Sequence, residues 1–103
     1  MKERRKSERI ETHLPAQWET ASGMRQGTIV NGSVGGCFVE AEVEDPGDEP
    51  IKLAIQLPHE GWIYLWGEVA FHLPTMGFGL HFTRSSNDEQ VTLDKWLHYL
   101  RTL

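Results

Sequence analysis

The chain has 103 residues, which allows one domain with a single modest core. Hydrophobic residues make up 39% of it and charged residues 24%, a composition typical of a folded globular protein and not of a disordered one. Its longest strongly apolar run, residues 61–67, is far shorter than the roughly 20 residues that cross a bilayer. No apolar stretch follows the basic start, so we expect a cytoplasmic protein without a membrane partner.

The net charge of −5 is distributed unevenly along the chain. Residues 1–9 carry five basic and two acidic side chains, a net charge of +3, whereas the other residues carry five basic and thirteen acidic side chains, a net charge of −8. An acidic body repels nucleic acid and anionic lipid. The short basic segment therefore favours a small anion over a long polyanion as a ligand.

Alternating apolar and polar residues, separated by turn residues, predict short strands through most of the chain. We expect strands over residues 14–20, 24–30, 37–40, 51–57, 62–73 and 78–82, with an acidic Pro/Gly loop over residues 42–50. In the fifth strand, one face carries Ile63, Leu65, Val69 and Phe71, and the other carries Trp62, Tyr64, Trp66 and Glu68. Both faces of this strand are largely apolar, so we expect the outer row to bind the helix or a second subunit.

Helical periodicity is confined to the C-terminus, where Leu93, Trp96, Leu97 and Leu100 recur at spacings of three and four residues. Six antiparallel strands cannot hide two apolar faces in a flat sheet, and closure into a barrel removes the exposed edges. The predicted fold is therefore all-β, a six-stranded antiparallel β-barrel with one C-terminal α-helix. We assign residues 1–103 to one domain: a flexible basic arm (1–12), the barrel (13–83) and the helix (86–101).

Arg4, Arg5 and Arg9 form the first candidate site, with the last two four residues apart. A guanidinium group binds phosphate bidentately, pairs with the O6 and N7 edge of guanine, and stacks on a flat base. The alternative interpretation is a solvated basic terminus without a ligand.

The second candidate site is the segment over residues 31–36, which interrupts the strand pattern. Asn31 and Ser33 present an amide and a hydroxyl together, and Gly35 and Gly36 allow a ligand to approach the backbone closely. Taken alone, the same residues are also typical of a simple turn.

Together these segments resemble the signature of the PilZ domain family, which binds the bacterial second messenger cyclic di-GMP. The family pattern is R-x-x-x-R followed by D/N-x-S-x-x-G, matched here by residues 5–9 and 31–36. The resemblance implies a six-stranded barrel with a C-terminal helix, and a ligand site made by the residues Arg4, Arg5, Arg9, Asn31, Ser33, Gly35 and Gly36. Because a basic residue precedes the first motif arginine, it also implies two cyclic di-GMP molecules per chain. The arginine arm would close over the ligand and change the surface that a downstream protein meets.

Other classes of function fit the sequence less well. The histidines are scattered without metal-site spacing, and Cys37 has no adjacent base, so we expect no catalytic residues, no metal and no cofactor. A PilZ-like interaction module without ligand binding stays an alternative. A barrel that binds single-stranded nucleic acid through Trp62, Tyr64 and Trp66 is disfavoured by the acidic body. The aromatic face and the helix are compatible with a homodimer, and the downstream target is not named by the sequence.

Overall fold

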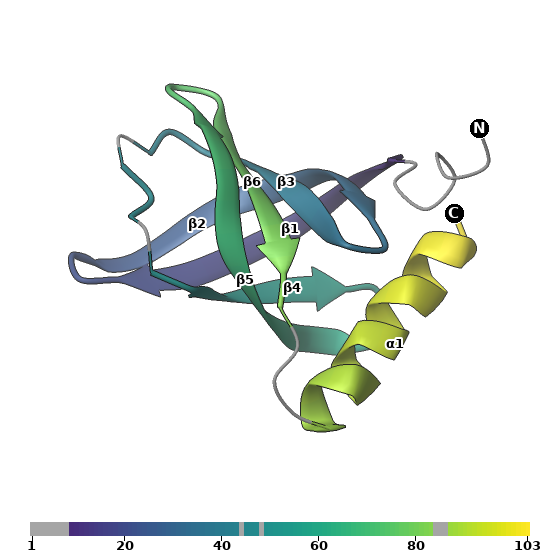
Figure 1. Ribbon diagram of the computed structural model, residues 1–103. Helices are drawn as coiled ribbons and strands as arrows, with labels where there is room; N and C mark the ends of the chain where they lie inside the picture. The colour runs from purple at the N-terminus through teal and green to yellow at the C-terminus, as the bar shows by residue number, and fades with distance from the viewer. Residues whose placement is uncertain (1–8, 44, 48, 84–86) are drawn as a thin grey trace.

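The computed structural model describes residues 9–43, 45–47, 49–83 and 87–103, and in it six strands close into an antiparallel barrel (Figure 1). The strand order around the barrel is β1–β2–β3–β6–β5–β4. The bounds are β1 Ile10–Thr20, β2 Gly23–Ser33, β3 Gly36–Glu40, β4 Ile51–Leu57, β5 Gly61–Leu73, β6 Gly77–Phe82 and α1 Asn87–Arg101. The predicted barrel with one C-terminal helix is confirmed. Among the described residues, no helix combines the length and the apolar character needed to cross a membrane.

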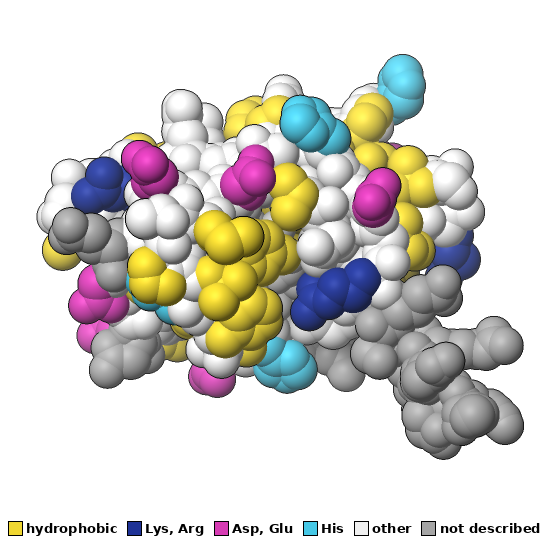
Figure 2. All heavy atoms as spheres, turned by 90° about the horizontal axis from the view of Figure 1, so that it is seen from above, with side chains coloured by type: hydrophobic (Ala, Val, Ile, Leu, Met, Phe, Trp, Pro, Cys, Tyr) yellow, Lys and Arg dark blue, Asp and Glu magenta, His cyan; other side chains and the backbone are white. Residues whose placement is uncertain are grey.

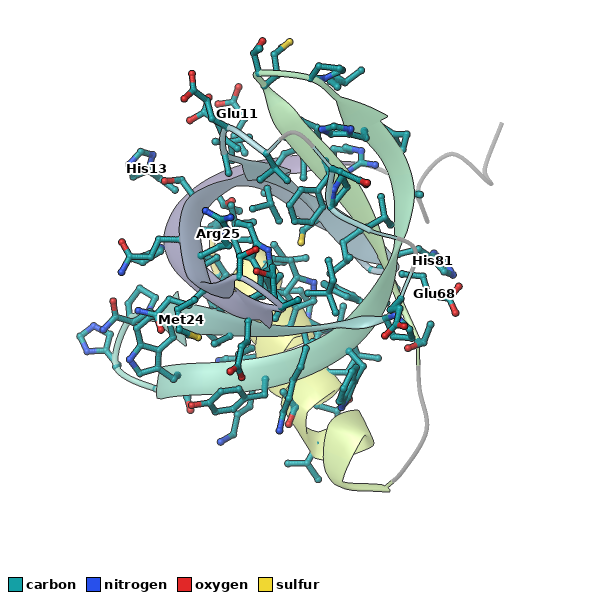
Figure 3. All side chains as sticks on the ribbon, turned by 90° about the vertical axis from the view of Figure 1, so that its left-hand side faces the viewer. Glu11, His13, Met24, Arg25, Glu68 and His81 are labelled. Carbon is teal, nitrogen blue, oxygen red and sulfur yellow. The ribbon has the colours of Figure 1, made fainter. Side chains whose placement is uncertain are left out.

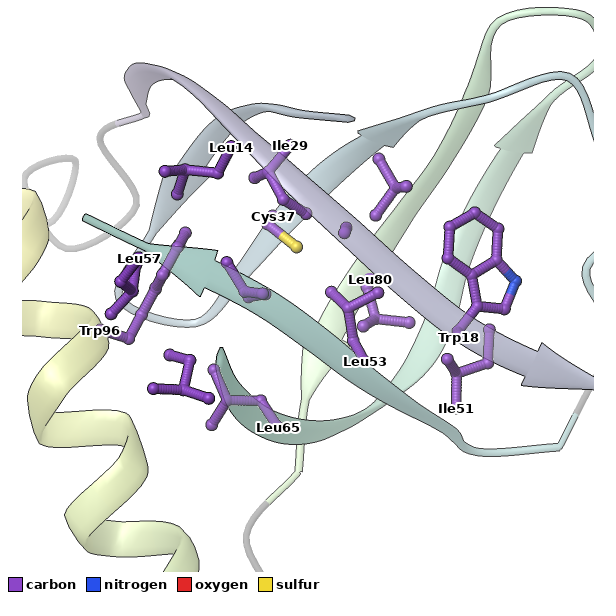
Figure 4. Packing of buried hydrophobic residues seen from close by; sticks show 14 of the residues in the cluster. Leu14, Trp18, Ile29, Cys37, Ile51, Leu53, Leu57, Leu65, Leu80 and Trp96 are labelled. Atoms are coloured by element: carbon purple, nitrogen blue, oxygen red, sulfur yellow. The ribbon is translucent and has the colours of Figure 1, made fainter. Parts of the chain in front are cut away.

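The core fills the barrel from one end to the other (Figure 4). Inward-facing residues alternate with exposed ones along β4, where Leu53, Ile55 and Leu57 are buried. Such alternation is what a strand with one buried face requires. Trp18 packs edge-on against Phe78 at one end of the core, with ring centroids 5.3 Å apart.

Three β-bulges change which residues face outward. In β5, the register shifts between Val69 and Phe71, so two residues of β5 lie opposite one residue of β6. A bulge of this kind reverses the alternation beyond it. Phe71 was expected on the inner face with Ile63 and Leu65, but it is 44% exposed and lies outside the barrel. The prediction for Phe71 was therefore wrong, because alternation alone carries no sign of the extra residue.

Outside the barrel, Phe71 covers a glycine. Phe38 of β3 and Phe71 of β5 pair with Gly79 from opposite sides, and their rings stack with centroids 5.9 Å apart. A Cβ on Gly79 would collide with the Phe71 ring. Figure 2 shows that hydrophobic side chains also gather on the barrel face seen from above in Figure 1.

Two strand boundaries differ from the sequence-based expectation. β1 begins at Ile10, where Ile10 and Glu11 pair with Gly32 and Asn31, so residues 10–12 belong to the barrel and not to the predicted arm. β2 continues to Ser33, and only residues 34 and 35 form the turn before β3. The expected break at Asn31 is absorbed by a bulge between Ile29 and Asn31, which lets strand pairing continue. Residues 1–8 and residue 86, where the predicted helix starts, lie outside the described residues.

The helix α1 lies at the barrel end opposite to the β1–β2 turn (Figure 1). It packs there through Trp96 and Leu100, which are buried. Trp96 meets the ring of Phe82 edge-on at 5.8 Å, and its indole Nε1 donates a buried hydrogen bond of 2.9 Å to the carbonyl oxygen of Ser33. The helix is thus joined directly to the end of β2.

Candidate functional site

The structure brings the two candidate segments together. The Nη1 atom of Arg9 donates a hydrogen bond of 2.8 Å to Oδ1 of Asn31, across 22 residues of sequence. Arg9 immediately precedes β1 and Asn31 lies near the end of β2, and the antiparallel pairing of Glu11 with Asn31 places them side by side. Arg9, the last residue of the first motif, therefore meets the second motif at one end of the barrel.

The β2 bulge determines which way Asn31 points. Ile29 pairs with Val39, and Asn31 pairs with the next residue, Phe38, so Val30 is the extra residue. Ile29 and Val39 are both fully buried, whereas Asn31 is partly exposed and within reach of Arg9. Without the extra residue, Asn31 would share the inward face with Ile29. The bulge thus aims the amide at the surface.

The residues of the turn differ in how much room surrounds them. Gly35 is open, because a Cβ built there would meet no atom within 4 Å. Gly36 is tight, since a Cβ there would collide with the carbonyl oxygen of Leu80 on β6. Ser33 is only 8% exposed. Asn31 and Gly35 are therefore accessible at the turn, whereas Gly36 is required for strand β3 to approach β6.

Beneath the turn, Gly32 leaves the space that the helix residue Trp96 occupies. A Cβ on Gly32 would collide with the indole ring of Trp96, which is fully buried. The same indole donates to the carbonyl oxygen of Ser33. From the sequence, Trp96 was expected among the periodic apolar residues of the C-terminal helix and was not connected to the site. The one sequence feature that could have indicated this contact is the glycine at the second position of the motif, Gly32, which leaves room for a large side chain.

Cys37 lies directly below the site, paired with Gly32 across the β2–β3 ladder. Its thiol is buried (Figure 4), and this burial raises the pKa of Cys37 to about 12. The positive charge of Arg9 lowers the same pKa by a smaller amount. Cys37 is therefore a protonated, unreactive core residue at neutral pH.

Two of the predicted site residues, Arg4 and Arg5, lie outside the described residues. The part of the chain that the structure describes contains no group of three or more His, Cys, Asp or Glu side chains that could hold a metal ion. What the described site offers is a guanidinium, an amide and open backbone at a turn. This combination can pair with phosphate oxygens and with the edge of a base, and it includes no nucleophile with an adjacent base.

The fold has clear relatives among solved structures. The PilZ domain of CeSA from a cellulose-synthesizing bacterium superposes with a TM-score of 0.73 at 18% identity, covering 91% of this chain and 98% of the other. The PilZ domain of YcgR from Escherichia coli, solved with c-di-GMP, gives 0.73 at 13% identity, with 92% and 89% covered. The inhibitor of motility MotI/DgrA from Bacillus subtilis gives 0.64 at 22% identity, with 87% and 48% covered. These likenesses establish the fold.

The sequence itself gives the family. No curated protein matches the chain in sequence. The sequence profile of the PilZ domain, however, matches residues 3–99, nearly the whole length and both candidate segments. The chain belongs to the PilZ domain family.

Proposed function

We propose that this protein is a cyclic di-GMP receptor that acts in the cytoplasm on a downstream protein. The observation that carries the proposal is the hydrogen bond between Arg9 and Asn31, which joins the two motif segments beside an open turn. The YcgR relative, whose PilZ domain was solved with c-di-GMP, supports the same ligand. The proposed site comprises the residues Arg4, Arg5, Arg9, Asn31, Ser33, Gly35 and Gly36.

The chemistry of the ligand matches these side chains. Cyclic di-GMP carries two phosphates and two guanines, and an arginine can bind either group. Arg9 uses one of its five donors on Asn31, which leaves the other donors for the ligand. Because Asn31 already orients the guanidinium, less side-chain entropy is lost when the ligand binds. Each good arginine contact to guanine contributes about 1–3 kcal/mol.

Ligand binding would act as a switch through the residues before Arg9. Fixing backbone costs about 1–2 kcal/mol per residue, so closure of the arm offsets much of the contact energy. Arg4 and Arg5 would contact the ligand only when the arm is closed, so the ligand would bind the closed state more tightly than the open state. We propose that Arg4 stacks against a second ligand molecule, which gives two cyclic di-GMP molecules per chain. The closed arm would then alter the surface that the downstream protein meets.

Calorimetric titration with cyclic di-GMP tests the proposal. We expect binding by the unaltered chain and at least a tenfold weakening by Arg5→Ala or Arg9→Ala, because each removes a bidentate contact. Arg25→Ala is the matched control, since Arg25 is an exposed arginine at the other end of the barrel. Normal binding by both arm variants would refute the site, and absence of heat and of a thermal shift at millimolar ligand would refute the receptor function.

A further inference from the structure

An open groove of about 1180 Å³ runs along the outside of the barrel. Its walls are the β1–β2 turn and the connection between β3 and β4, and its floor is the outer face of β4 and β5. On this floor lie Trp62, Tyr64 and Trp66, which we call the aromatic row. Figure 3 views the barrel from the end with the β1–β2 turn, where Met24 and Arg25 of the groove wall are labelled.

The fold leaves the aromatic row uncovered. Trp62, Tyr64 and Trp66 are 37%, 51% and 36% exposed, although α1 contacts β5 and packs on the barrel through Trp96 and Leu100. The sequence-based expectation was that the helix or a second subunit would bind this row; α1 contacts β5 but leaves each of the three rings at least 36% exposed. Large aromatic side chains gathered in an exposed groove are typical of a binding surface.

The rim of the groove is acidic. Among the described residues, four exposed carboxylates and two exposed cations, Arg25 and Lys52, line it. The carboxylates belong to Glu19, Glu42, Asp45 and Glu49. One of the two cations is already engaged, since Nζ of Lys52 lies over the ring of Tyr64, 5.4 Å from its centroid. The surplus of carboxylates indicates a positively charged partner.

Lys52 also shows which chemistry the aromatic row accepts. A cation over an aromatic face is attracted by the ring quadrupole, and arginine is the cation most often found there in proteins. Successive side chains of the row belong to every second residue of β5, so they lie about 6.5–7 Å apart. An extended peptide that carries an arginine at every second residue has the same repeat.

We propose that the aromatic groove binds an extended basic segment of another protein, with arginine side chains stacked on the aromatic row and paired with the acidic rim. A second copy of the chain fits less well, because symmetric pairing of two such grooves brings carboxylates against carboxylates. Nucleic acid and anionic membranes are repelled by the same carboxylates. The groove thus selects a cationic polypeptide.

This groove is separate from the proposed cyclic di-GMP site. Arg25 and Met24 lie at the tip of the β1–β2 hairpin, and Arg9 and Asn31 lie at its base. Strands of this length separate the tip from the base by about 30 Å. The aromatic row comes nearer to the ligand site, because the carbonyl oxygens of Trp66 and Gly35 accept hydrogen bonds from the adjacent residues Thr83 and Phe82. The groove and the ligand site share no residue, so peptide binding can be measured without cyclic di-GMP, and either activity can fail without the other.

The test uses two capped ten-residue peptides, one with arginine alternating with glycine, and one with equal arginine content grouped at one end. Binding is followed through the indole N–H signals of the 15N-labelled protein. We expect the signals of Trp62 and Trp66 to shift saturably with the alternating peptide, while that of Trp96, which is buried and does not line the groove, stays in place. Trp66→Ala should weaken binding about two- to fivefold.

Charge variants give the matched comparison. The triple variant Glu42→Gln, Asp45→Asn, Glu49→Gln removes three of the four rim carboxylates, and Glu11→Gln, Glu40→Gln, Glu68→Gln removes the same charge from exposed sites outside the groove. We expect the first variant to bind at least fivefold more weakly and the second to bind almost normally. Equal effects of both variants, equal binding of both peptides, or self-association through Trp62 and Trp66 would overturn the proposal.

Discussion

Replacing Gly32 with alanine should destabilise the fold by crowding the helix, although the new methyl group is the smallest available. A Cβ at Gly32 would lie 2.7 Å from Cη2 of Trp96 and closer still to Cζ2. The indole cannot retreat easily, since it is fully buried and bonded to the carbonyl oxygen of Ser33. Overpacking of this kind typically costs about 1–3 kcal/mol. We expect the free energy of unfolding to fall by that amount.

A second substitution tests whether Trp96 is the cause. Trp96→Phe shortens the side chain and so removes the two ring atoms that the new methyl group would strike. Alone, it leaves a void and takes away the donor to Ser33, at a cost of about 1–3 kcal/mol for the lost bond. In the double variant the methyl group enters the vacated space. We therefore expect the free energy of unfolding to fall by at least about 1 kcal/mol less in the double variant than the sum of its losses in the two single variants.

Urea unfolding followed by far-UV circular dichroism measures these differences from the midpoint at constant m-value. Gly35→Ala is the control, because a Cβ at Gly35 meets no atom within 4 Å. Additive losses for Gly32→Ala and Trp96→Phe would refute the reasoning, since they would mean that the two positions do not interact. A loss for Gly35→Ala equal to that for Gly32→Ala would refute it as well.

Gly36→Ala should lower the urea midpoint more than Gly35→Ala, because its Cβ would strike the Leu80 carbonyl oxygen, which belongs to rigid backbone. Equal midpoints would contradict this. Trp18→Phe should cost less than Trp96→Phe in the same assay, since Nε1 of Trp18 is buried without a partner among the described residues. Between pH 9 and 12 the unfolded chain loses the Cys37 proton while the folded chain keeps it, so stability should fall by up to about 1.4 kcal/mol per pH unit. Unfolding of Cys37→Ala should lack this contribution.

The strands and the helix could be predicted from the sequence because each has one buried face. Alternation placed the strand over residues 51–57 correctly, and the spacing of Trp96 and Leu100 placed the helix. Both patterns are contained in short stretches of sequence, so they can be recognised without knowledge of the rest of the fold. Closure into a barrel was predicted because the strands carry two apolar faces that a flat sheet would leave exposed.

The bulges could not be predicted in this way. A bulge adds one residue between strands that are distant in sequence, and its energy depends on the pairing of both. Phe71 was therefore placed on the wrong face, and the outward direction of Asn31 had no sequence-based explanation. The contact between Arg9 and Asn31 was likewise out of reach, since the motifs indicate a shared site and not its geometry.

The turn motif combines requirements of the fold with requirements of the ligand, and the structure separates them. Gly32 and Gly36 are glycines because Trp96 and the β6 backbone occupy the space where a side chain would lie. A chain that kept only the fold would retain both of them. Arg9, Asn31 and Gly35 have no such packing role among the described residues, which is consistent with the ligand role proposed for them. Variants at these three positions should therefore abolish binding in a protein that still folds, whereas variants at Gly32 or Gly36 would confound the two effects.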